Sequence, residues 1–182
     1  GGGFCVLALG KLGGRELNYS SDIDLMAVYQ PSPSGDADRE RALCDRVMER
    51  LRDDLARHTA EGSAYRVDLR LRPYGRSGML VYPLDSLAEY YRDTAGLWEI
   101  QALLKARPIA GSLDVGEAFL RRLRPVLARP WSGAHIAESI ERMRGQAVQA
   151  AARAASEEQD IKSGLGGIRD LEFLVQGLQL AW

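Results

Sequence analysis

The sequence predicts an α+β fold, in which a mixed sheet with flanking helices is followed by a C-terminal segment of helices only. Short apolar runs bounded by glycine and proline indicate strands between residues 4 and 82, whereas helical periodicity alone continues beyond Pro108. Of the 182 residues, 46% are apolar and 27% are charged, which is ordinary for a globular protein. We therefore expect a mixed domain over residues 1–110 and a helical domain over residues 111–182.

The first two strands are expected on either side of a glycine-rich turn. Residues 4–9 (FCVLAL) form an apolar run that ends at Gly10, which is typical of a buried strand. Residues 11–21 predict a turn or a short helix. Residues 22–29 (DIDLMAVY) alternate acidic and apolar residues before they become continuously apolar, so we expect a strand with one functional face at its beginning.

The later elements follow from loop signals and periodicity. Asp38 ends a loop rich in proline and serine and is expected to cap a helix over 39–58. Residues 64–71 alternate strictly, which predicts a strand with Tyr65, Val67, Leu69 and Leu71 on its core face and Arg66, Asp68, Arg70 and Arg72 on its charged face. A turn follows, and then an expected strand and helices at 79–82, 84–106, 113–128, 134–157 and 168–182.

The formal net charge of −1, from 24 basic and 25 acidic residues, predicts neither a nucleic-acid nor a membrane partner. No apolar run approaches the roughly 18 residues of a membrane span. Cys5 and Cys44 lack metal-binding spacing and are expected to be buried free thiols, which fits a cytoplasmic protein. Because the sequence ends inside an apolar helical pattern without a capping signal, we expect it to be part of a longer chain.

The acids at the start of the second strand are the main candidates for chemistry. Asp22 and Asp24 share a strand face, where two carboxylates repel each other and need cations. Asp68 presents a third acid in the same style, and three converging carboxylates suit Mg²⁺, with two ions expected for phosphoryl displacement. Taken alone, the two acids are equally typical of solvated residues paired with arginines.

The context of these acids favours phosphate binding. Three glycines and two serines precede them, and these predict free backbone N–H groups and hydroxyls that contact a phosphate: Gly10, Gly13, Gly14, Ser20 and Ser21. Arg70 and Arg72 share the predicted face of Asp68 and are expected to neutralise a triphosphate. Each glycine, however, is also explained by a turn that needs a positive φ, and each arginine by pairing with an aspartate.

A second glycine-rich turn precedes the last predicted helix. Lys162 and Arg169 flank it and are predicted to form a second phosphate-facing element. Asp170 in the first helical turn is explained by the helix dipole alone. Lys105 and Arg107, at the end of the helix predicted over 84–106, are interpreted as packing residues.

Four segments resemble the glutamine synthetase adenylyltransferase family, the bifunctional bacterial regulators of nitrogen assimilation: residues 13–25 (GGRELNYSSDIDL), 67–75 (VDLRLRPYG), 98–107 (WEIQALLKAR) and 166–173 (GGIRDLEF). The resemblance implies a nucleotidyltransferase-type sheet followed by a helical bundle, within a protein of two homologous catalytic halves. One half transfers AMP from ATP to a tyrosine of glutamine synthetase. The other half removes that AMP by phosphorolysis and releases ADP.

The same resemblance implies roles for individual residues. Asp22, Asp24 and Asp68 match the metal-binding acids of the family, and the nucleotide side of the site is matched by Gly10, Gly13, Gly14 and Ser21. The implied partners are glutamine synthetase, ATP or ADP, phosphate and, in the full-length enzyme, a nitrogen-signalling regulatory protein. Residues 166–173 and the sequence LRPYG resemble the N-terminal, deadenylylating half, whereas residues 98–107 resemble the C-terminal half. The deadenylylating half is the preferred prediction.

Two alternatives to this prediction stay open. One is a nucleotidyltransferase-fold enzyme that modifies a small molecule, although residues 98–107 and 166–173 argue against it. The other is a catalytically silent regulatory module, which binds a nucleotide, a signalling protein or glutamine synthetase without turnover.

Overall fold

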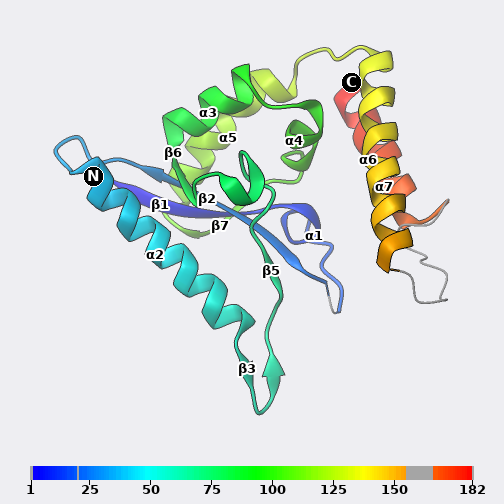
Figure 1. Cartoon of the computed structure of the whole chain (residues 1–182). Coiled ribbons are helices and arrows are strands. Elements are labelled where there is room, and N and C mark those ends of the chain that lie inside the picture. Colours follow the sequence, from blue (N-terminus) through cyan, green and yellow to red (C-terminus); the bar gives the residue numbers. More distant parts are fainter. Residues whose placement is uncertain (1, 20, 155–165, 182) are drawn as a thin grey trace. The chain divides into compact units, whose positions relative to one another are not determined.

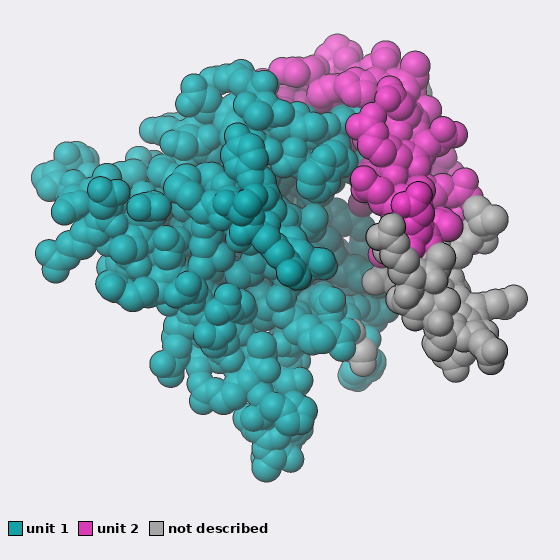
Figure 2. Space-filling model, viewed as in Figure 1, with its two compact units in different colours: residues 1–124 teal, residues 125–182 magenta. Residues whose placement is uncertain are grey.

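The computed structural model describes residues 2–19, 21–154 and 166–181, which Figure 1 traces in colour. The chain divides into two compact units, Gly1–Arg124 and Pro125–Trp182 (Figure 2). The first unit contains a mixed five-stranded sheet with helices, so the predicted α+β class is confirmed. The predicted domain boundary near Gly111 lies within the first unit, because helix α5 (Leu113–Leu127) packs its Phe119 ring against Tyr91 there.

Two long antiparallel strands, β1 (Gly3–Ala8) and β2 (Ile23–Gln30), form the centre of the sheet (Figure 1). Outside them the strand order is β5-β2-β1-β7, with one further strand on β2. β5 (Val67–Asp68) and β6 (Val81–Pro83) both pair with β2 in parallel, while β7 (Arg107–Gly111) pairs antiparallel with β1. The short hairpin of β3 (His58–Thr59) and β4 (Gly62–Ser63) forms a separate two-stranded sheet.

Helices cover both faces of this sheet, which explains why β1 and β2 are apolar on both sides. On one face, α2 (Ala37–Ala56) places Met48 in a buried cluster with alternate residues of the two strands. On the other face, α3 (Leu84–Asp93) places the hydroxyl of Tyr91 3.6 Å from the sulfur of Met26. The rigid centre of the sheet therefore supports the strand ends that carry the candidate acids.

Two helix predictions need correction. The helix predicted from residue 39 begins at Ala37, and its cap is Asp36, whose side chain accepts hydrogen bonds from the N–H groups of Asp38 and Arg39. The helix predicted over residues 84–106 is broken into α3 and α4 (Leu97–Ala102), its last residues form a turn, and strand β7 begins directly after them. Gly96 begins the second piece, where its N–H donates to Glu99, so a new helix starts at this point.

The strand predicted over residues 64–71 is much shorter than its alternating pattern indicates. Only Val67 and Asp68 pair with β2, and Leu69 is buried as expected. Tyr65, predicted on the core face, remains 43% exposed because the chain has not yet joined the sheet at that residue. Local alternation thus identified the pairing residues but overestimated how far the pairing extends.

The second unit contains helices α6 (Gly133–Ala154) and α7 (Ile168–Ala181). Their described bounds are close to those of the helices predicted over residues 134–157 and 168–182. Gly177 allows their close contact, because a Cβ there would lie 2.7 Å from the Cδ1 atom of Ile140. Among the helices of the described residues, none is long and apolar enough to cross a membrane.

Candidate active site

Asp24, near the beginning of β2, lies directly opposite Asp68, the last residue of the parallel strand β5. The register pairs Asp24 of β2 with Asp68 of β5. Directly opposite residues of neighbouring strands project from the same sheet face, so both carboxylates belong to one site. Asp22 comes two residues before Asp24, one residue before β2 begins, and alternation directs it to the same side.

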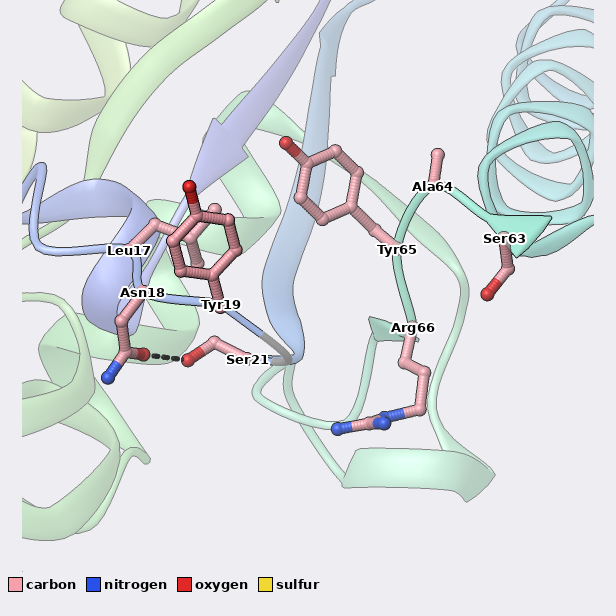
Figure 3. A pocket seen from close by; sticks show the side chains of 8 residues that line it. All are labelled: Leu17, Asn18, Tyr19, Ser21, Ser63, Ala64, Tyr65 and Arg66. Atoms are coloured by element: carbon pink, nitrogen blue, oxygen red, sulfur yellow. Dashed lines mark hydrogen bonds between the residues drawn. The ribbon is translucent and has the colours of Figure 1, made fainter. Parts of the chain in front are cut away.

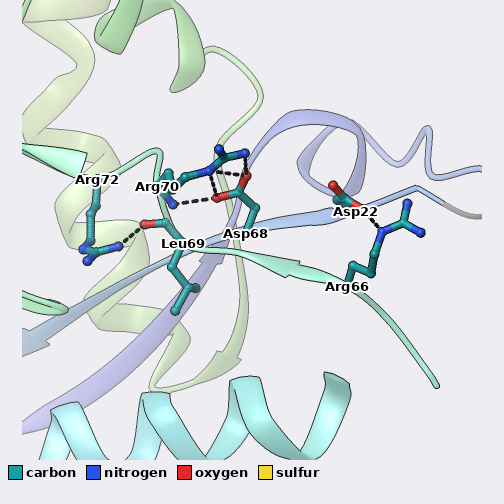
Figure 4. A network of polar contacts seen from close by, with 6 residues as sticks. All are labelled: Asp22, Arg66, Asp68, Leu69, Arg70 and Arg72. Atoms are coloured by element: carbon teal, nitrogen blue, oxygen red, sulfur yellow. Dashed lines mark hydrogen bonds and ion pairs between the residues drawn. The ribbon is translucent and has the colours of Figure 1, made fainter. Parts of the chain in front are cut away.

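Two arginines compensate these acids (Figure 4). The Nε atom of Arg70 lies 2.9 Å from both carboxylate oxygens of Asp68, and the backbone N–H of Arg70 donates to Asp68 Oδ1 at 2.8 Å. The Nε atom of Arg66 donates to Oδ1 of Asp22. Contacts between an arginine and both oxygens of a carboxylate fix position and charge, and Arg70 makes such contacts with Asp68.

The electrostatics link Arg70 to all three acids. The hydrogen bond from Arg70 lowers the pKa of the Asp68 carboxyl, although partial burial opposes this effect. In turn, the pKa of Arg70 is raised, first by its hydrogen bond to Asp68 and further by the charges of Asp24 and Asp22. The three predicted acids therefore act on one cation, which places them within electrostatic reach of each other.

The donor chemistry of these acids suits Mg²⁺, which prefers carboxylate oxygens. Among the residues that the structure describes, however, no three Asp, Glu, His or Cys side chains are arranged to hold a metal ion. In this arrangement Arg66 engages the carboxylate of Asp22, and Arg70 engages that of Asp68. The strand register fits a shared metal site, and the guanidinium groups supply the compensating charge in this arrangement.

The glycine-rich turn before β2 packs against the acids. Gly10 begins the short helix α1 (Gly10–Gly13) with a φ of +50°, and a Cβ on it would lie 2.5 Å from Oδ2 of Asp24. The N–H groups of Gly13 and Gly14 donate to the carbonyls of Leu9 and Gly10. They are therefore not free to bind a phosphate, and the expectation of free donors at these two glycines is wrong. What the turn provides at Gly10 is space for the Asp24 carboxylate.

The segment of residues 98–107 anchors the same turn. Arg107 donates from Nε to the carbonyl of Gly13 at 3.2 Å and from Nη2 to that of Leu12 at 3.0 Å. Lys105 pairs with Glu16 at 2.6 Å, and its own carbonyl leaves no room for a Cβ at Gly13. Interpreted from the sequence as packing residues, Lys105 and Arg107 thus position the turn that contacts Asp24.

The two predicted serines have different outcomes. Ser20 lies outside the described residues. The hydroxyl of Ser21 donates to the side-chain oxygen of Asn18, which also accepts from Nζ of Lys11 at 3.4 Å. The Ser21 hydroxyl thus belongs to a polar network of the loop between α1 and β2, and its predicted contact with a phosphate stays a prediction.

A pocket of about 480 Å³ opens beside Asp22 and Asp68, and arginines dominate its lining: Arg52, Arg66, Arg70, Arg72 and Arg76. Five guanidinium groups against two carboxylates make this pocket cationic, in contrast to the near-neutral chain. Arg70 and Arg72 both line it, and their predicted contact with a triphosphate stays a prediction. Nε of Arg72 also donates to the carbonyl of Met79 at 2.9 Å, which fixes the turn that follows β5.

Sequence reasoning missed the other three arginines as candidates. Arg52 comes from helix α2, and no local pattern in its surroundings indicates which helix face meets β5. Arg76 lies in a turn that follows Tyr74 and Gly75, both with positive φ, so the sequence PYGR carried a usable signal. Arg66 was assigned to the charged strand face, and its pairing with Asp22 depends on the register of β5.

A second pocket, of about 600 Å³, adjoins the first at Arg66 (Figure 3). Its lining includes Tyr19 from the loop before β2 and Tyr65 from the segment before β5. Neither tyrosine was a predicted site residue. The sequence gives little indication of either residue, because an exposed aromatic side chain suggests a binding surface only when its neighbours in the fold are known.

The second glycine-rich turn lies in the other unit. Lys162 is outside the described residues. Asp170 accepts two hydrogen bonds from Arg144, both at 3.0 Å, and one from the N–H of Gly166 at 2.8 Å. These contacts cap helix α7 and tie it to α6, which is the structural role of Asp170. Arg169 is half-buried at the first turn of α7, and its predicted contact with a phosphate stays a prediction.

Comparison with known proteins places this geometry in a family. The family model described as Glutamate-ammonia ligase adenylyltransferase matches residues 1–122, and the one described as GlnD PII-uridylyltransferase matches residues 134–182. Relatives from Streptomyces avermitilis, Thioalkalivibrio sulfidiphilus and Xanthomonas campestris pv. campestris, each called bifunctional glutamine synthetase adenylyltransferase/adenylyl-removing enzyme, are 41%, 42% and 42% identical over 96% of this chain. The chain spans only 17–19% of their length.

Proposed function

The chain belongs to the glutamate-ammonia ligase adenylyltransferase family, and on this premise we propose that it catalyses Mg²⁺-dependent nucleotidyl transfer on glutamine synthetase. Through this reaction it regulates nitrogen assimilation. The observation that carries the proposal is the pairing of Asp24 with Asp68 beside a glycine turn that is shaped around Asp24. More specifically, we infer the deadenylylating reaction, in which AMP is removed from adenylyl-tyrosine by phosphorolysis.

In the proposed reaction, an oxygen of hydrogenphosphate attacks the phosphorus of the adenylyl group. The bond from this phosphorus to the tyrosine oxygen breaks, the proton of hydrogenphosphate ends on the tyrosine, and ADP is released. Mg²⁺ held by Asp22, Asp24 and Asp68 would neutralise charge on the transferred phosphoryl group. Arg70, which already faces these acids, would contribute further positive charge to the same group.

The arginine-lined pocket supports the phosphorolytic direction. It lies directly beside Asp68, and its surplus of guanidinium groups suits a small, doubly charged anion. Arg52 and Arg76 widen the cationic surface beyond the residues that pair with the acids. A hydrogenphosphate ion bound there would lie next to the adenylyl phosphorus, as the attacking group requires.

The experiment compares the two directions with the same protein. In one arm, the chain is incubated with adenylylated glutamine synthetase, phosphate and Mg²⁺, and ADP is measured. In the other arm, unmodified glutamine synthetase and labelled ATP are supplied, and the labelled AMP on the protein is measured. Asp24→Asn is the inactive control, because the amide cannot supply the anionic ligand that the reaction needs.

Phosphate-dependent release of ADP that is lost in Asp24→Asn is the expected result. AMP incorporation in the second arm instead would assign the chain to the adenylylating half. A folded chain that binds ADP without turnover in either arm would be the silent regulatory module and would overturn the proposed catalysis.

A further inference from the structure

Two exposed tyrosines lie in segments next to the candidate acids. Tyr19 is fully exposed in the loop that leads into β2, and Tyr65 is 43% exposed in the segment before β5. Figure 3 shows the Tyr19 ring on the loop before β2 and the Tyr65 ring on the segment before β5, and both residues line the pocket. Large aromatic side chains in water are costly for stability, so a pair of them in one pocket indicates a binding surface.

The remaining lining makes this a pocket for a flat, neutral group with polar edges. Leu17 and Ala64 supply apolar contact, while Asn18, Ser21 and Ser63 supply hydrogen-bonding groups. The lining contains no acidic side chain. Its volume of about 600 Å³ lies within the range of pockets that bind small molecules.

Arg66 connects this pocket to the acids. Its side chain lines both pockets, and its Nε atom donates to Asp22. A phosphoryl group at the three acids would therefore lie at one end of the aromatic pocket. A group attached to that phosphoryl and directed past Arg66 would extend between the loop of Tyr19 and the segment of Tyr65 (Figure 3).

We propose that the aromatic pocket binds the purine base of the adenylyl group, with Tyr19 and Tyr65 as its stacking surfaces. This inference rests on the proposed function, and it adds the residues that recognise the nucleoside. Bases stack on aromatic side chains through their π-faces, and tyrosine does so with little loss of conformational entropy. The side chains of Asn18 and Ser63 also line the pocket, and in this proposal they are the partners of the polar edge of the purine.

The test compares a ligand that has a base with one that lacks it. Affinities for ADP and for inorganic pyrophosphate are measured by calorimetry on the 182-residue chain in the presence of Mg²⁺. In Tyr65→Ala and Tyr19→Ala, we expect the Kd for ADP to rise about 10-fold, within the range seen when a stacking residue is removed. The Kd for pyrophosphate should stay unchanged, and Tyr65→Phe should bind ADP as the unmodified chain does.

Trp98→Ala is the matched control, since Trp98 is also 43% exposed and does not line the pocket. Circular dichroism verifies that each variant is folded. Specific ¹³C labelling of tyrosine gives a second readout. The ring signals of Tyr19 and Tyr65 are assigned as those that disappear in Tyr19→Phe and Tyr65→Phe. ADP should shift these two signals, and pyrophosphate should not.

Unchanged ADP affinity in both alanine variants would overturn this inference, even if AMP transfer continues. A rise only in the KM for adenylylated glutamine synthetase would also overturn it, because the pocket would then contact the protein substrate. By contrast, weaker ADP binding in the variants of a chain that transfers no AMP would support the base pocket while contradicting the proposed catalysis.

Discussion

The two glycine-rich turns of this chain have similar sequences and different surroundings. A Cβ on Gly10 would contact the carboxylate of Asp24, whereas a Cβ on Gly166 would meet no described atom within 4 Å. The first turn is anchored by Arg107 through backbone carbonyls. The N–H of Gly166 instead donates to Asp170, which is tied to Arg144.

This difference shows what a glycine-rich motif does and does not indicate. Both turns need a positive φ, with +50° at Gly10 and +75° at Gly166, so backbone conformation alone explains a glycine at either position. Only the first turn also has a candidate acid, Asp24, at the place where a side chain on the glycine would be. At the second turn, Asp170 lies in the first turn of α7 and accepts a hydrogen bond from the N–H of Gly166, and acids near helix N-termini are commonly stabilising.

The largest effect is expected from the acids beside the first turn. Asp24→Asn and Asp68→Asn should each lower the rate of AMP transfer by about 100- to 1,000-fold, because they remove charge that stabilises the transition state. Asp170→Asn should leave that rate unchanged. Single-turnover measurements on the three variants provide the test, and an equal loss in all three would show that the second turn also belongs to the site.

A smaller effect is expected from a matched pair of glycine variants. Gly10→Ala and Gly166→Ala both place a Cβ on a residue with positive φ, at a cost of roughly 1 kcal/mol each. Only Gly10→Ala also displaces the Asp24 carboxylate, so its rate should fall by up to about 100-fold. Thermal unfolding shows whether the two variants lose similar stability, and equal rates would contradict the proposed contact.

Removing the anchor of the first turn should have a more moderate effect. Arg107→Gln loses the two hydrogen bonds to the carbonyls of Leu12 and Gly13, so Gly10 is held less firmly against Asp24. We expect the rate of AMP transfer to fall by less than in Gly10→Ala, with an unchanged fold by circular dichroism. Arg107→Lys, which keeps the charge but not the paired donors, should recover little of the loss.

The second turn should affect the pH dependence of stability and leave the rate unchanged. The N–H of Gly166 and then Arg144 lower the pKa of Asp170, so this residue stabilises the fold above the pKa that it has when unfolded. That contribution is lost as the pH falls through the lowered pKa. Asp170→Asn should therefore lower the melting temperature at pH 7 more than at pH 3, and an equal shift at both would contradict the cap.

Part of this structure was predictable from local pattern. β1 and β2 are apolar on both faces because helices cover both, and the alternation of Asp22 and Asp24 indicated which end of β2 carries the candidate acids. Strand β7 was not predicted, because its five residues pair only along the edge of β1 and include Pro108. Its pairing depends on a partner that lies about a hundred residues earlier in the chain.

The site was predictable where its residues lie close in sequence and not where the fold alone joins them. Strand alternation predicted a shared face for Asp22 and Asp24 and a charged face for Asp68, whereas only the structure shows the register that pairs Asp24 with Asp68. Arg52, in contrast, enters the pocket from a helix whose orientation no local pattern shows. Tyr65 was assigned to the core because the alternation of residues 64–71 begins before the chain reaches the sheet.

The central proposal, that the acids beside the first turn form one metal site, is tested most directly by titrating the chain with Mg²⁺ while the side-chain carboxyl signals of aspartate are followed by ¹³C NMR. The proposal predicts that the signals of Asp24 and Asp68 shift together over the same range of Mg²⁺ concentration, and that the signal of Asp170 does not move. Shifts of Asp24 and Asp68 at clearly different concentrations, or no shift of either, would contradict a shared metal site.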